Sequence, residues 1–492
     1  MMTPTYEETK QYQRDYSLVP VCKEIFADVI TPITLLRKLA RLDRHYYLLE
    51  SVEGGERWAR YSFLGFHPVL HAVCKDGEVT VKSGEIETKL PGDPMEVLRG
   101  LLNKYRAPSI PGMPSFTGGF VGYFSYEMLR FAEKKLRLKK SEFYDFDLML
   151  FDKVIAYDHL RQKICVVVNA RTEEGEQGYR AAELEIEKII HMICEPMPLE
   201  REMESDTRGS ADDTPVFTCN MSRQDYCAMV EKTKHYIREG DIFQGVVSRR
   251  FEADYKESLL NAYRVLRTTN PSPYMYFIQS GDVQIAGASP ETMVRLTHGK
   301  LVTFPVAGTR KRGRTPEEDR ALEQELLADE KELAEHNMLV DLARNDIGKI
   351  SEYGTVQVED YMSVHRFSRV MHIASVVTGT LKEGKDACDA VQALLPAGTL
   401  SGAPKFRACE IIDELEPTAR GVYGGAIGYL DFSGNLDVCI AIRTAVKKDE
   451  KVYVQAGAGI VADSVPEKEY EECENKAGAV IEAIRRAKEV RG

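Results

Sequence analysis

Apolar and polar residues alternate over short stretches in the N-terminal part of the chain, and this pattern predicts several β-strands. A nearly continuous apolar run predicts a buried strand at residues 45–53. Alternating residues predict short strands over 69–89, separated by Gly-containing turns, and a β-hairpin over 152–170. Apolar residues at helical spacing predict an amphipathic helix over 178–194. This part of the chain therefore mixes strands and helices.

The C-terminal part begins with a helix whose limits the sequence marks clearly. Ser222 is a candidate N-cap, Gly240 is a candidate end, and apolar residues recur at helical spacing between them. A strand is predicted over 242–253. The last helix is predicted to begin with a capping box formed by Ser464 and Glu467. Because strands recur among helices without a regular βαβ rhythm, we expect an α+β fold.

One segment differs from the rest in composition. Residues 195–215 are polar, acidic and poor in apolar side chains. Such a segment buries too little apolar surface to offset the entropy lost on ordering, which predicts a linker or a long surface loop. The chain is therefore predicted to form two domains, residues 1–205 and residues 216–490.

Charge and cysteine content exclude several classes of protein. The chain has 65 basic and 77 acidic residues, a net charge of −12, which disfavours general binding to phosphate backbones. Its ten cysteines show no C-x-x-C pair, as expected for reduced thiols in the cytoplasm. The first residues lack the apolar run of a signal peptide, and no apolar stretch approaches the roughly 20 residues of a membrane helix. We expect a cytoplasmic protein that binds neither nucleic acid nor membranes.

Three segments match nucleotide-binding or nucleic-acid-binding patterns only in part. Residues 379–385 have the spacing of a phosphate loop, but Asp386 follows where that loop needs a hydroxyl. Residues 457–462 fit G-x-G-x-x-A, but no second parallel strand follows them. The basic run 310–314 leads directly into acidic residues, which is typical of a solvated loop before a helix. Binding of nucleotides or nucleic acids is therefore not expected.

Two predicted helices carry pairs of acidic residues. Glu469, Glu472 and Lys476 of the last helix step by three and four residues and share one face. Glu332 and Glu335 have the same three-residue spacing on an earlier helix. Carboxylates one turn apart suit a hard divalent cation, and a nearby lysine suits an anionic ligand. The alternative is an ordinary solvated Glu–Lys face on each helix, and the spacing alone leaves both interpretations open.

Seven collinear segments are the most specific signal in the sequence. They are GASPE (287–291), FPVAGTRKRG (304–313), AEHNMLVDLARNDIG (334–348), VMHIASVVTG (370–379), GTLSGAPK (398–405), YGGAIGYLD (423–431) and AGAGIVADSVPEKEYEECENKA (456–477). On these segments, over about residues 220–485, the chain resembles the chorismate-utilising enzyme family. That family includes enzymes that form anthranilate, aminodeoxychorismate, isochorismate or salicylate. The resemblance implies a layered β-sandwich core flanked by helices.

The same resemblance implies a magnesium-dependent site for chorismate. Glu335 and Glu472 would bind Mg²⁺, with Glu332 and Glu469 behind them or linked through water. The metal would hold the ring carboxylate of chorismate, supported by Lys476. The other residues expected to contact the substrate are Gly308, Thr309, Tyr423, Arg443, Gly457, Ala458 and Gly459. The planar guanidinium of an arginine suits a carboxylate because it can donate two hydrogen bonds.

Two departures from family patterns indicate the nucleophile. Family members that activate water resemble one another in a lysine where this chain has Gln244, and an amide cannot act as a base. Members that form aminodeoxychorismate carry a nucleophilic lysine where this chain has Ala307. Both departures favour attack by ammonia at C2 of chorismate, which yields anthranilate and pyruvate through 2-amino-2-deoxyisochorismate, the first step of tryptophan biosynthesis. Formation of aminodeoxychorismate for the folate pathway is the alternative.

Glu291 and His372 are the expected catalytic residues. By resemblance, Glu291 would protonate the departing C4 hydroxyl, which requires a raised pKa. His372 would assist the elimination of pyruvate as an acid or a base. Outside its motif, a histidine in an apolar strand is more often a core residue. A non-catalytic sensor that kept the fold is a further possibility, and the intact acids Glu291, Glu335 and Glu472 argue against it.

The sequence also indicates a partner and an inhibitor. None of the ten cysteines has the G-x-C-x-G setting of an amidotransferase nucleophile, so ammonia is expected from glutamine through a separate glutamine amidotransferase subunit, component II. The segments LLES (48–51) and NPSPYMYF (270–277) resemble the tryptophan feedback site of family members. The expected contacts are Glu50, Ser51, Asn270, Pro273, Tyr274 and Met275, with Tyr276 and Cys439 near them. Ordinary strand packing is the alternative for these residues.

Overall fold

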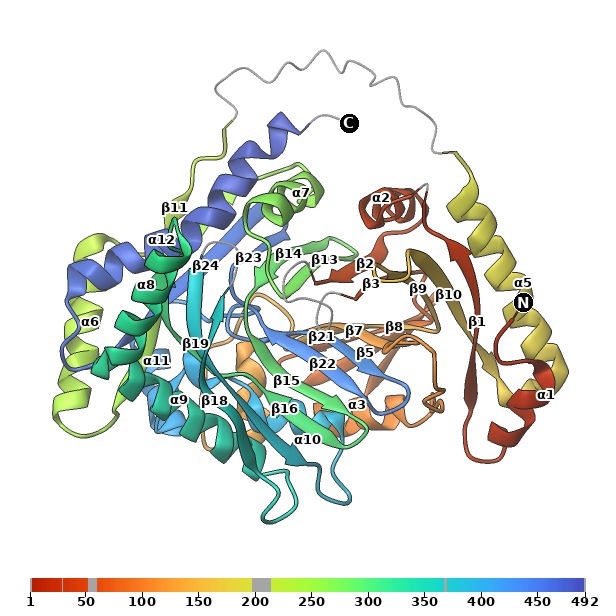
Figure 1. Cartoon of the computed structure of the whole chain (residues 1–492), viewed down its shortest axis with the longest axis horizontal. Coiled ribbons are helices and arrows are strands. Elements are labelled where there is room, and N and C mark those ends of the chain that lie inside the picture. The colour runs from red at the N-terminus through yellow and green to blue at the C-terminus, as the bar shows by residue number, and fades with distance from the viewer. Residues whose placement is uncertain (1, 29, 52–59, 197–213, 367–369, 491–492) are drawn as a thin grey trace.

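Two large antiparallel sheets form the centre of the molecule. The computed structural model describes residues 2–28, 30–51, 60–196, 214–366 and 370–490, and within them each sheet has 12 strands. Tyr47 and Tyr276 of one sheet pack with Val121 and Ile427 of the other in a shared apolar core. Helices cover the outer faces (Figure 1). The predicted α+β fold, a β-sandwich flanked by helices, is confirmed.

The first sheet carries its own layer of helices. Its strands, in spatial order, are β1 (Leu18–Phe26), β10 (Lys163–Arg171), β9 (Lys153–Asp158), β3 (Tyr61–Phe66), β2 (His45–Glu50), β13 (Tyr274–Ser280), β14 (Val283–Ser289), β23 (Thr444–Lys448), β24 (Lys451–Ile460), β12 (Gln244–Asp254) and β11 (Thr218–Cys219), with β20 (Gly402–Ala403) paired to β12. The helices packed on this side are α2 (Pro32–Leu42), α5 (Gly175–Cys194), α6 (Arg223–Arg238), α7 (Leu260–Thr269) and α12 (Pro466–Arg486). Their apolar stripes close the outer face of the sheet.

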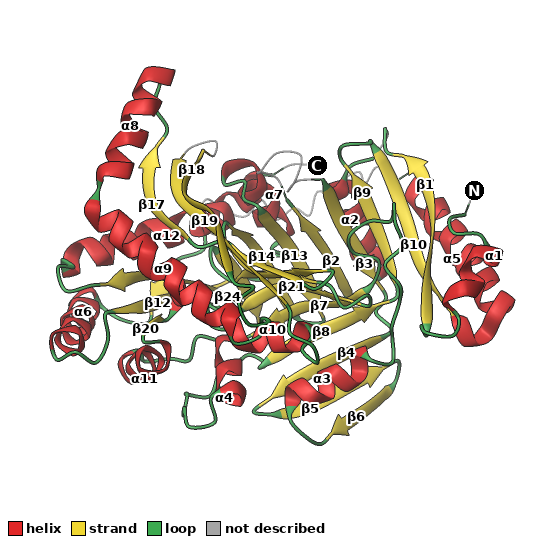
Figure 2. Ribbon diagram, turned by 60° about the horizontal axis from the view of Figure 1, so that its bottom comes forward, coloured by secondary structure: helices red, strands yellow, loops and turns green. Residues whose placement is uncertain are grey.

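The second sheet has the same construction. Its strands, in spatial order, are β17 (Val306–Lys311), β19 (Val370–Thr380), β16 (Lys300–Thr303), β15 (Thr292–Thr297), β22 (Leu436–Ile440), β21 (Ala426–Asp431), β7 (Gly119–Phe124), β8 (Phe146–Phe151), β4 (Leu70–Lys75), β5 (Glu78–Ser83) and β6 (Ile86–Leu90), with β18 (Gln357–Arg366) paired to β19. Helices α3 (Pro94–Leu102), α9 (Glu330–Gly348) and α10 (Ala387–Leu394) contribute to its outer core. Figure 2 shows α9 crossing in front of these strands.

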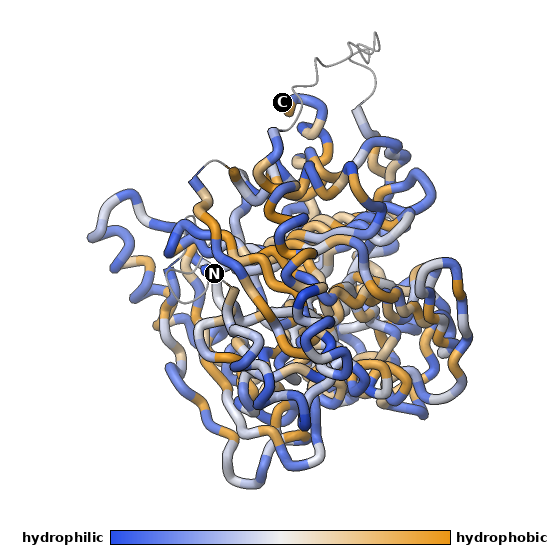
Figure 3. The backbone as a smooth tube through the Cα atoms, turned by 90° about the vertical axis from the view of Figure 1, so that its right-hand side faces the viewer, coloured by the Kyte–Doolittle hydropathy of each residue, from blue (hydrophilic) through white to orange (hydrophobic). Residues whose placement is uncertain are grey.

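The remaining helices are short or lie at the periphery. They are α1 (Tyr6–Thr9), α4 (Leu129–Ala132), α8 (Pro316–Ala328) and α11 (Lys405–Leu415), with 3₁₀ turns η1 (Lys10–Tyr12), η2 (Tyr126–Met128), η3 (Thr172–Glu174), η4 (Gly398–Leu400) and η5 (Ala487–Glu489). Figure 3 shows apolar segments gathered along the inner strands and helix faces, with polar segments in the outer turns. No described helix is both long and apolar enough to cross a membrane.

Both sheets contain strands from either side of the predicted linker. Strand β2 pairs with β13, with Glu50 opposite Met275, and β7 pairs with β21, with Gly122 opposite Gly428. Segments 1–205 and 216–490 therefore share both sheets, and the residues of each lie side by side (Figure 1). Most of the linker predicted over 195–215 lies outside the described residues.

The first residues of α6 and α12 test the helix caps predicted from the sequence. The predicted cap of α6 is confirmed, because Ser222 Oγ accepts from the Asp225 N–H at 3.1 Å and the Asp225 carboxylate accepts in return from the Ser222 N–H. The capping box predicted for α12 is wrong. The helix begins at Pro466, which keeps the preceding Val465 extended, and Ser464 Oγ accepts instead from the Val461 N–H at 3.1 Å.

The two nucleotide-like segments do not form the loops that their motifs require. Gly379 lies within β19, and Asp386 caps α10 while it pairs with Arg99 at 2.6 Å. Gly457 and Gly459 lie inside β24 rather than in a turn. At both places the first glycine of the motif lies in a strand rather than in the loop before the helix, so neither segment forms the glycine-rich loop that cradles a phosphate.

Candidate active site

The residues predicted to do chemistry converge between α9 and α12, where elements of the two sheets meet. Figures 1 and 2 both show α9, α12, β19 and β24 on the same side of the molecule. The contributing residues are Glu291 after β14, Gly308 and Thr309 on β17, Glu332 and Glu335 on α9, His372 on β19, Arg443 before β23, Gly457–Gly459 on β24 and Lys476 on α12. Side chains nearly 200 positions apart in the sequence thus act on one another.

Glu291 is held in the connection between the two sheets. Its carbonyl accepts from the Ile440 N–H at 3.0 Å, and its Oε1 accepts from Thr399 Oγ at 3.1 Å. Burial raises the pKa of the Glu291 carboxyl to about 7, against the opposing effects of Thr399, Lys476 and Arg443. A carboxyl with this pKa can hold a proton near neutral pH and give it to a leaving group.

Arg443 faces Glu291 from a second connection between the sheets, the loop between β22 and β23. Its backbone has a φ of +50°, a left-handed conformation that residues other than glycine rarely adopt. The Arg443 carbonyl accepts from the Ala288 N–H at 3.2 Å, which ties this loop to the end of β14. Burial lowers the pKa of Arg443, while the neighbouring Glu291 raises it. Strain held at such a place is common at functional sites, and the guanidinium can bind a carboxylate there.

His372 is oriented by two contacts through one ring nitrogen. Its Nδ1 lies 3.0 Å from the Gly308 carbonyl oxygen and 3.0 Å from Thr309 Oγ. Because a carbonyl oxygen can only accept, Nδ1 carries the proton, and Nε2 of the neutral ring is the basic nitrogen. Burial lowers the pKa of His372, and the charge of Arg443 lowers it further. The ring is therefore neutral near pH 7 and suited to accept a proton.

A β-bulge explains the glycine beside His372. The pairing of β17 with β19 shifts between Ala307 and Thr309, and Gly308 at the shift has a φ of +63°. A Cβ atom at Gly308 would lie 3.0 Å from Leu326 and 3.3 Å from Glu332 Oε2. Glycine is needed for both the conformation and the space. The bulge presents Thr309 Oγ and the Gly308 carbonyl to the histidine.

The glycines of β24 make room for neighbouring polar side chains. A Cβ atom at Gly457 would lie 2.9 Å from the Tyr423 hydroxyl, and one at Gly459 would lie 2.5 Å from Gln244 Nε2. Between them, Ala458 is fully buried. Lys476 Nζ donates to the Gly457 carbonyl at 3.1 Å. Gln244 is itself buried, and its Oε1 has no hydrogen-bond partner.

Among the four predicted acids, Glu335 of α9 lies near enough to Glu472 of α12 for their charges to interact. Burial raises the pKa of Glu335, and the neighbouring carboxylates of Glu332 and Glu472 raise it further. Burial likewise raises the pKa of Glu469, with a smaller contribution from Glu472. Glu335 is only partly exposed, whereas Glu472 and Lys476 form the half-exposed pair expected of a solvated face. Carboxylates from two helices act on each other across the gap between them.

The donor set of this acidic group suits a divalent cation. All four donors are carboxylate oxygens, and their mutual repulsion is what a bound cation would relieve. In the structure, basic side chains offset part of this charge: Lys476 pairs with Glu472 at 2.7 Å and Arg310 with Glu332 at 3.4 Å. No group of three or more His, Cys, Asp or Glu side chains is gathered closely enough in the described chain to hold an ion alone. Magnesium commonly takes one or two protein carboxylates and fills its shell with water and substrate oxygens.

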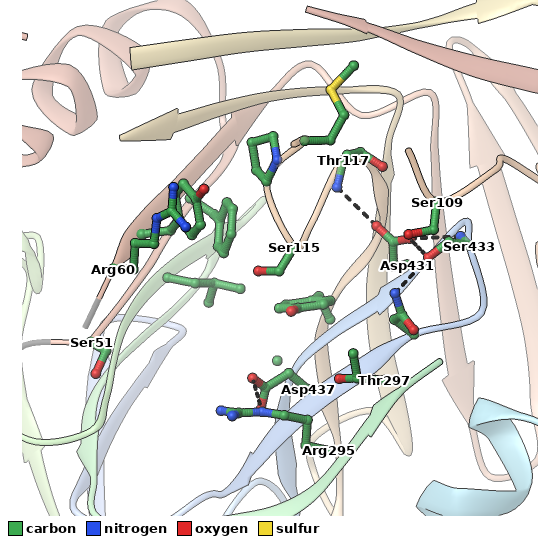
Figure 4. A pocket seen from close by; sticks show the side chains of 18 of the residues that line it. Ser51, Arg60, Ser109, Ser115, Thr117, Arg295, Thr297, Asp431, Ser433 and Asp437 are labelled. Atoms are coloured by element: carbon green, nitrogen blue, oxygen red, sulfur yellow. Dashed lines mark hydrogen bonds and ion pairs between the residues drawn. The ribbon is translucent and has the colours of Figure 1, made fainter. Parts of the chain in front are cut away.

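A separate cavity of about 590 Å³ lies between the sheets. The residues predicted for the feedback site that line it are Glu50, Ser51, Pro273, Tyr274, Met275, Tyr276 and Cys439. Aromatic side chains line it further, together with the Arg295–Asp437 pair at 2.9 Å, which Figure 4 shows at the floor of the cavity. The lining combines aromatic and other apolar side chains with many polar ones, which suits a small amphipathic ligand.

Glu50 and Asn270 differ in role from the other residues predicted for the feedback site. The Glu50 carboxylate points to α7, where it accepts from the Tyr263 hydroxyl at 2.6 Å and from Arg267 Nε at 2.5 Å. Asn270 ends α7 and is not among the described residues that line the cavity. Glu50 therefore fixes the wall of the cavity through α7, and Ser51, Pro273, Tyr274 and Met275 present the surface.

Comparison with known proteins places this geometry in a family. A model of the chorismate binding enzyme family matches residues 44–482. The chain belongs to the chorismate binding enzyme family. The match begins at residue 44, whereas the motifs in the sequence cover only about residues 220–485, so the N-terminal strands from β2 onward belong to the family fold as well. The family expected from the seven segments is confirmed.

Several relatives of this chain share one name with each other. It is 48% identical, over the whole of both chains, to "Anthranilate synthase component 1" of Acetivibrio thermocellus. It is 45% identical to the protein of that name from Pseudomonas aeruginosa, over 95% of this chain and 96% of the relative. The crystal structure of anthranilate synthase component I from Streptococcus pneumoniae superposes with a TM-score of 0.77 at 38% identity, covering 93% of this chain and 99% of that one.

The structure adds residues to the site that the sequence did not reveal. Thr399 binds Glu291 from η4, and its motif GTLSGAPK indicates the family but no role for this threonine. Thr292 and Asp437 hold the cavity wall, and neither stands out by spacing or by residue type. The adjacency of Thr292 to Glu291 is the one signal in the sequence that could have directed attention to it.

Proposed function

We propose that the enzyme converts chorismate and ammonia to anthranilate and pyruvate, the reaction indicated by the name of its relatives. The observation that carries this proposal is the Glu291 carboxyl, whose pKa burial raises to about 7, beside the cations Arg443 and Lys476. An acid of this kind can protonate a hydroxyl leaving group, while the cations bind a dianionic substrate.

Binding is divided among residues of both sheets. Arg443 would bind the carboxylate of the enolpyruvyl side chain through two parallel hydrogen bonds. Tyr423, which lies against Gly457, would contact the same side of the substrate, and Gly308 and Thr309 would line the opposite side. Lys476 bridges Gly457 and Glu472 and would add positive charge for the ring carboxylate.

Glu335 and Glu472 would hold Mg²⁺, with Glu332 and Glu469 behind them. When bound, the ion supplies positive charge for the ring carboxylate of chorismate and fixes the ring. The mutual repulsion of these carboxylates supports the assignment, because it is released when a cation joins them. Lys476, now paired with Glu472, is placed to contact the anionic substrate beside the ion.

The protein then moves two protons. Glu291 gives its proton to the C4 hydroxyl, which leaves as water while ammonia bonds to C2, and the C2 ammonium group then loses one proton to give 2-amino-2-deoxyisochorismate. Nε2 of the neutral His372 takes a ring proton, the ring–oxygen bond to the enolpyruvyl group breaks, and the released enolate takes up a proton to become pyruvate, leaving anthranilate. Ala307, buried in β17, offers no nucleophile for the aminodeoxychorismate route.

The nitrogen source and the inhibitor complete the proposed function. Ammonia would come from glutamine through a glutamine amidotransferase subunit, as the designation component 1 of the relatives supports. Tryptophan would bind in the 590 Å³ cavity and inhibit the enzyme. All ten cysteines are free thiols, which supports a place in the reducing cytoplasm.

The choice of nitrogen source tests the proposed function. We expect the purified chain to form anthranilate from chorismate, Mg²⁺ and ammonium chloride, and to form none when glutamine replaces the ammonium salt. The reason is that no cysteine has the setting of an amidotransferase nucleophile. Anthranilate fluorescence provides the readout. Glutamine-dependent activity of the isolated chain would contradict the proposed partner, and inactivity with ammonium would contradict the proposed reaction.

A further inference from the structure

The segment that carries Glu291 is fixed from the side of the cavity. In the pairing of β13 with β14, Tyr274 lies directly opposite Ser289, two residues before Glu291. The hydroxyl of the same tyrosine lies 2.9 Å from Thr292 Oγ, one residue after Glu291. One cavity-lining residue therefore meets both ends of the four-residue segment 289–292, through its backbone at Ser289 and through its hydroxyl at Thr292.

The Tyr274 hydroxyl is also part of the cavity wall. It donates to Asp437 Oδ1 at 2.7 Å, and Arg295 binds the other oxygen of Asp437 at 2.9 Å. Arg295 Nη2 lies 3.3 Å from the Tyr274 hydroxyl. Tyr274, Arg295 and Asp437 all line the cavity, where Figure 4 shows Arg295 and Asp437 facing into it. A ligand that binds against this wall competes for, or displaces, the groups that hold Tyr274.

Thr292 lies between the cavity and the catalytic acid. Its side chain is buried, and it lines a small recess that it shares with Glu291 and Thr399. Its own strand is irregular at this place, because β15 carries one extra residue against β22 between Thr292 and Val294. A bulge leaves backbone hydrogen bonds unmade, so the hydroxyl contact with Tyr274 has more influence on the position of this segment than it would in a regular ladder.

We propose that Thr292 is a positioning residue that transmits occupancy of the cavity to Glu291 through its hydrogen bond with Tyr274. When tryptophan fills the cavity and shifts Tyr274, the bond carries the shift to residues 289–292 and moves the Glu291 carboxyl away from Thr399. Inhibition thus acts on the placement of the acid. This inference rests on the proposed function, in which Glu291 is the acid and tryptophan is the inhibitor.

The proposal separates binding of tryptophan from inhibition by it. In Thr292→Val, which keeps the volume of the side chain but removes its hydroxyl, we expect the tryptophan-induced rise in melting temperature to stay as in the parent. We expect the tryptophan concentration for half-inhibition to rise about tenfold, since the link that couples the two sites is lost. Thr292→Ser, which retains the hydroxyl, should restore inhibition.

Two further variants make the test specific. Tyr274→Phe removes the other hydroxyl of the pair and should weaken inhibition in the same way. Thr9→Val is the matched control, since this buried threonine at the end of α1 donates to the Tyr6 carbonyl at 2.6 Å, on the opposite side of the molecule from α9 and α12 (Figure 1), and it should behave as the parent. The rescue by serine is a result that a general loss of stability would not produce.

The outcomes distinguish this inference from the proposed function. Half-inhibition of Thr292→Val at the parent's tryptophan concentration would overturn the role of Thr292. Loss of the thermal shift in parallel with loss of inhibition would also overturn it, because Thr292 would then belong to the binding wall alone. A parent enzyme that shows neither a thermal shift nor inhibition at millimolar tryptophan would overturn the proposed inhibitor itself, whatever the variants do.

Discussion

Replacement of Glu291 by glutamine is expected to lower kcat by a factor of about 10²–10⁴. Glutamine keeps the shape of the side chain and its contact with Thr399, but it has no acidic proton for the C4 hydroxyl. The KM for chorismate should change little, since Arg443 and Lys476 remain. Steady-state measurement of anthranilate formation checks this result. Glu482→Gln, on the exposed surface of α12, provides a matched control that should keep full activity.

The pH dependence of the same variant gives a second readout. Because burial raises the pKa of Glu291 to about 7, the protonated acid is lost as the pH rises through 7. In the parent, kcat/KM should therefore fall above about pH 7, and this decrease should be absent from the residual activity of Glu291→Gln. A variant that keeps most of the parent's activity, or that keeps the decrease above pH 7, would contradict the assignment of Glu291 as the acid.

Replacement of His372 by methionine is expected to separate the two half-reactions. Methionine fills a comparable space but cannot accept a proton, so elimination of pyruvate should slow by a factor of about 10²–10⁴, while the amination step remains. The expected result is consumption of chorismate with accumulation of 2-amino-2-deoxyisochorismate. Chromatography of the reaction mixture with mass detection measures chorismate, the intermediate and anthranilate together.

The control for His372 is the residue that orients it. Thr309→Val removes one contact of Nδ1 but leaves the Gly308 carbonyl, so it should slow elimination much less than His372→Met. Unchanged anthranilate formation in His372→Met would show that the histidine is a core residue of β19. Loss of chorismate consumption would show that it acts in the first step.

The sequence predicted the local elements better than it predicted their arrangement. Ser222 and Asp225 mark the start of α6 because a capping box is formed by residues three apart. Gly457 and Gly459 make room for Tyr423 and Gln244, and this reason for the two glycines depends on contacts between side chains distant in the sequence. Local spacing determines caps and helix faces, but it contains no information on which strand lies opposite.

Long-range pairing explains what the sequence could not reveal. Nothing in residues 45–50 indicates that β2 pairs with β13, yet this pairing joins the two predicted segments in one sheet and forms a wall of the cavity. The contact of Glu291 with Thr399 joins residues 108 positions apart. Asn270 matched a family segment, but α7 ends there and the residue does not line the cavity within the described chain. A motif predicts residue types at a site, and the three-dimensional fold decides which of them face the ligand.

The product formed from chorismate, Mg²⁺ and ammonium chloride is the most direct test of the proposed reaction. Ala307 provides no nucleophile, and Glu291 and His372 carry out the two proton transfers. We therefore predict anthranilate and pyruvate in equal amounts. Anthranilate fluorescence and an enzymatic assay for pyruvate measure both products in one time course. Formation of aminodeoxychorismate without release of pyruvate, or no consumption of chorismate, would contradict the proposed function.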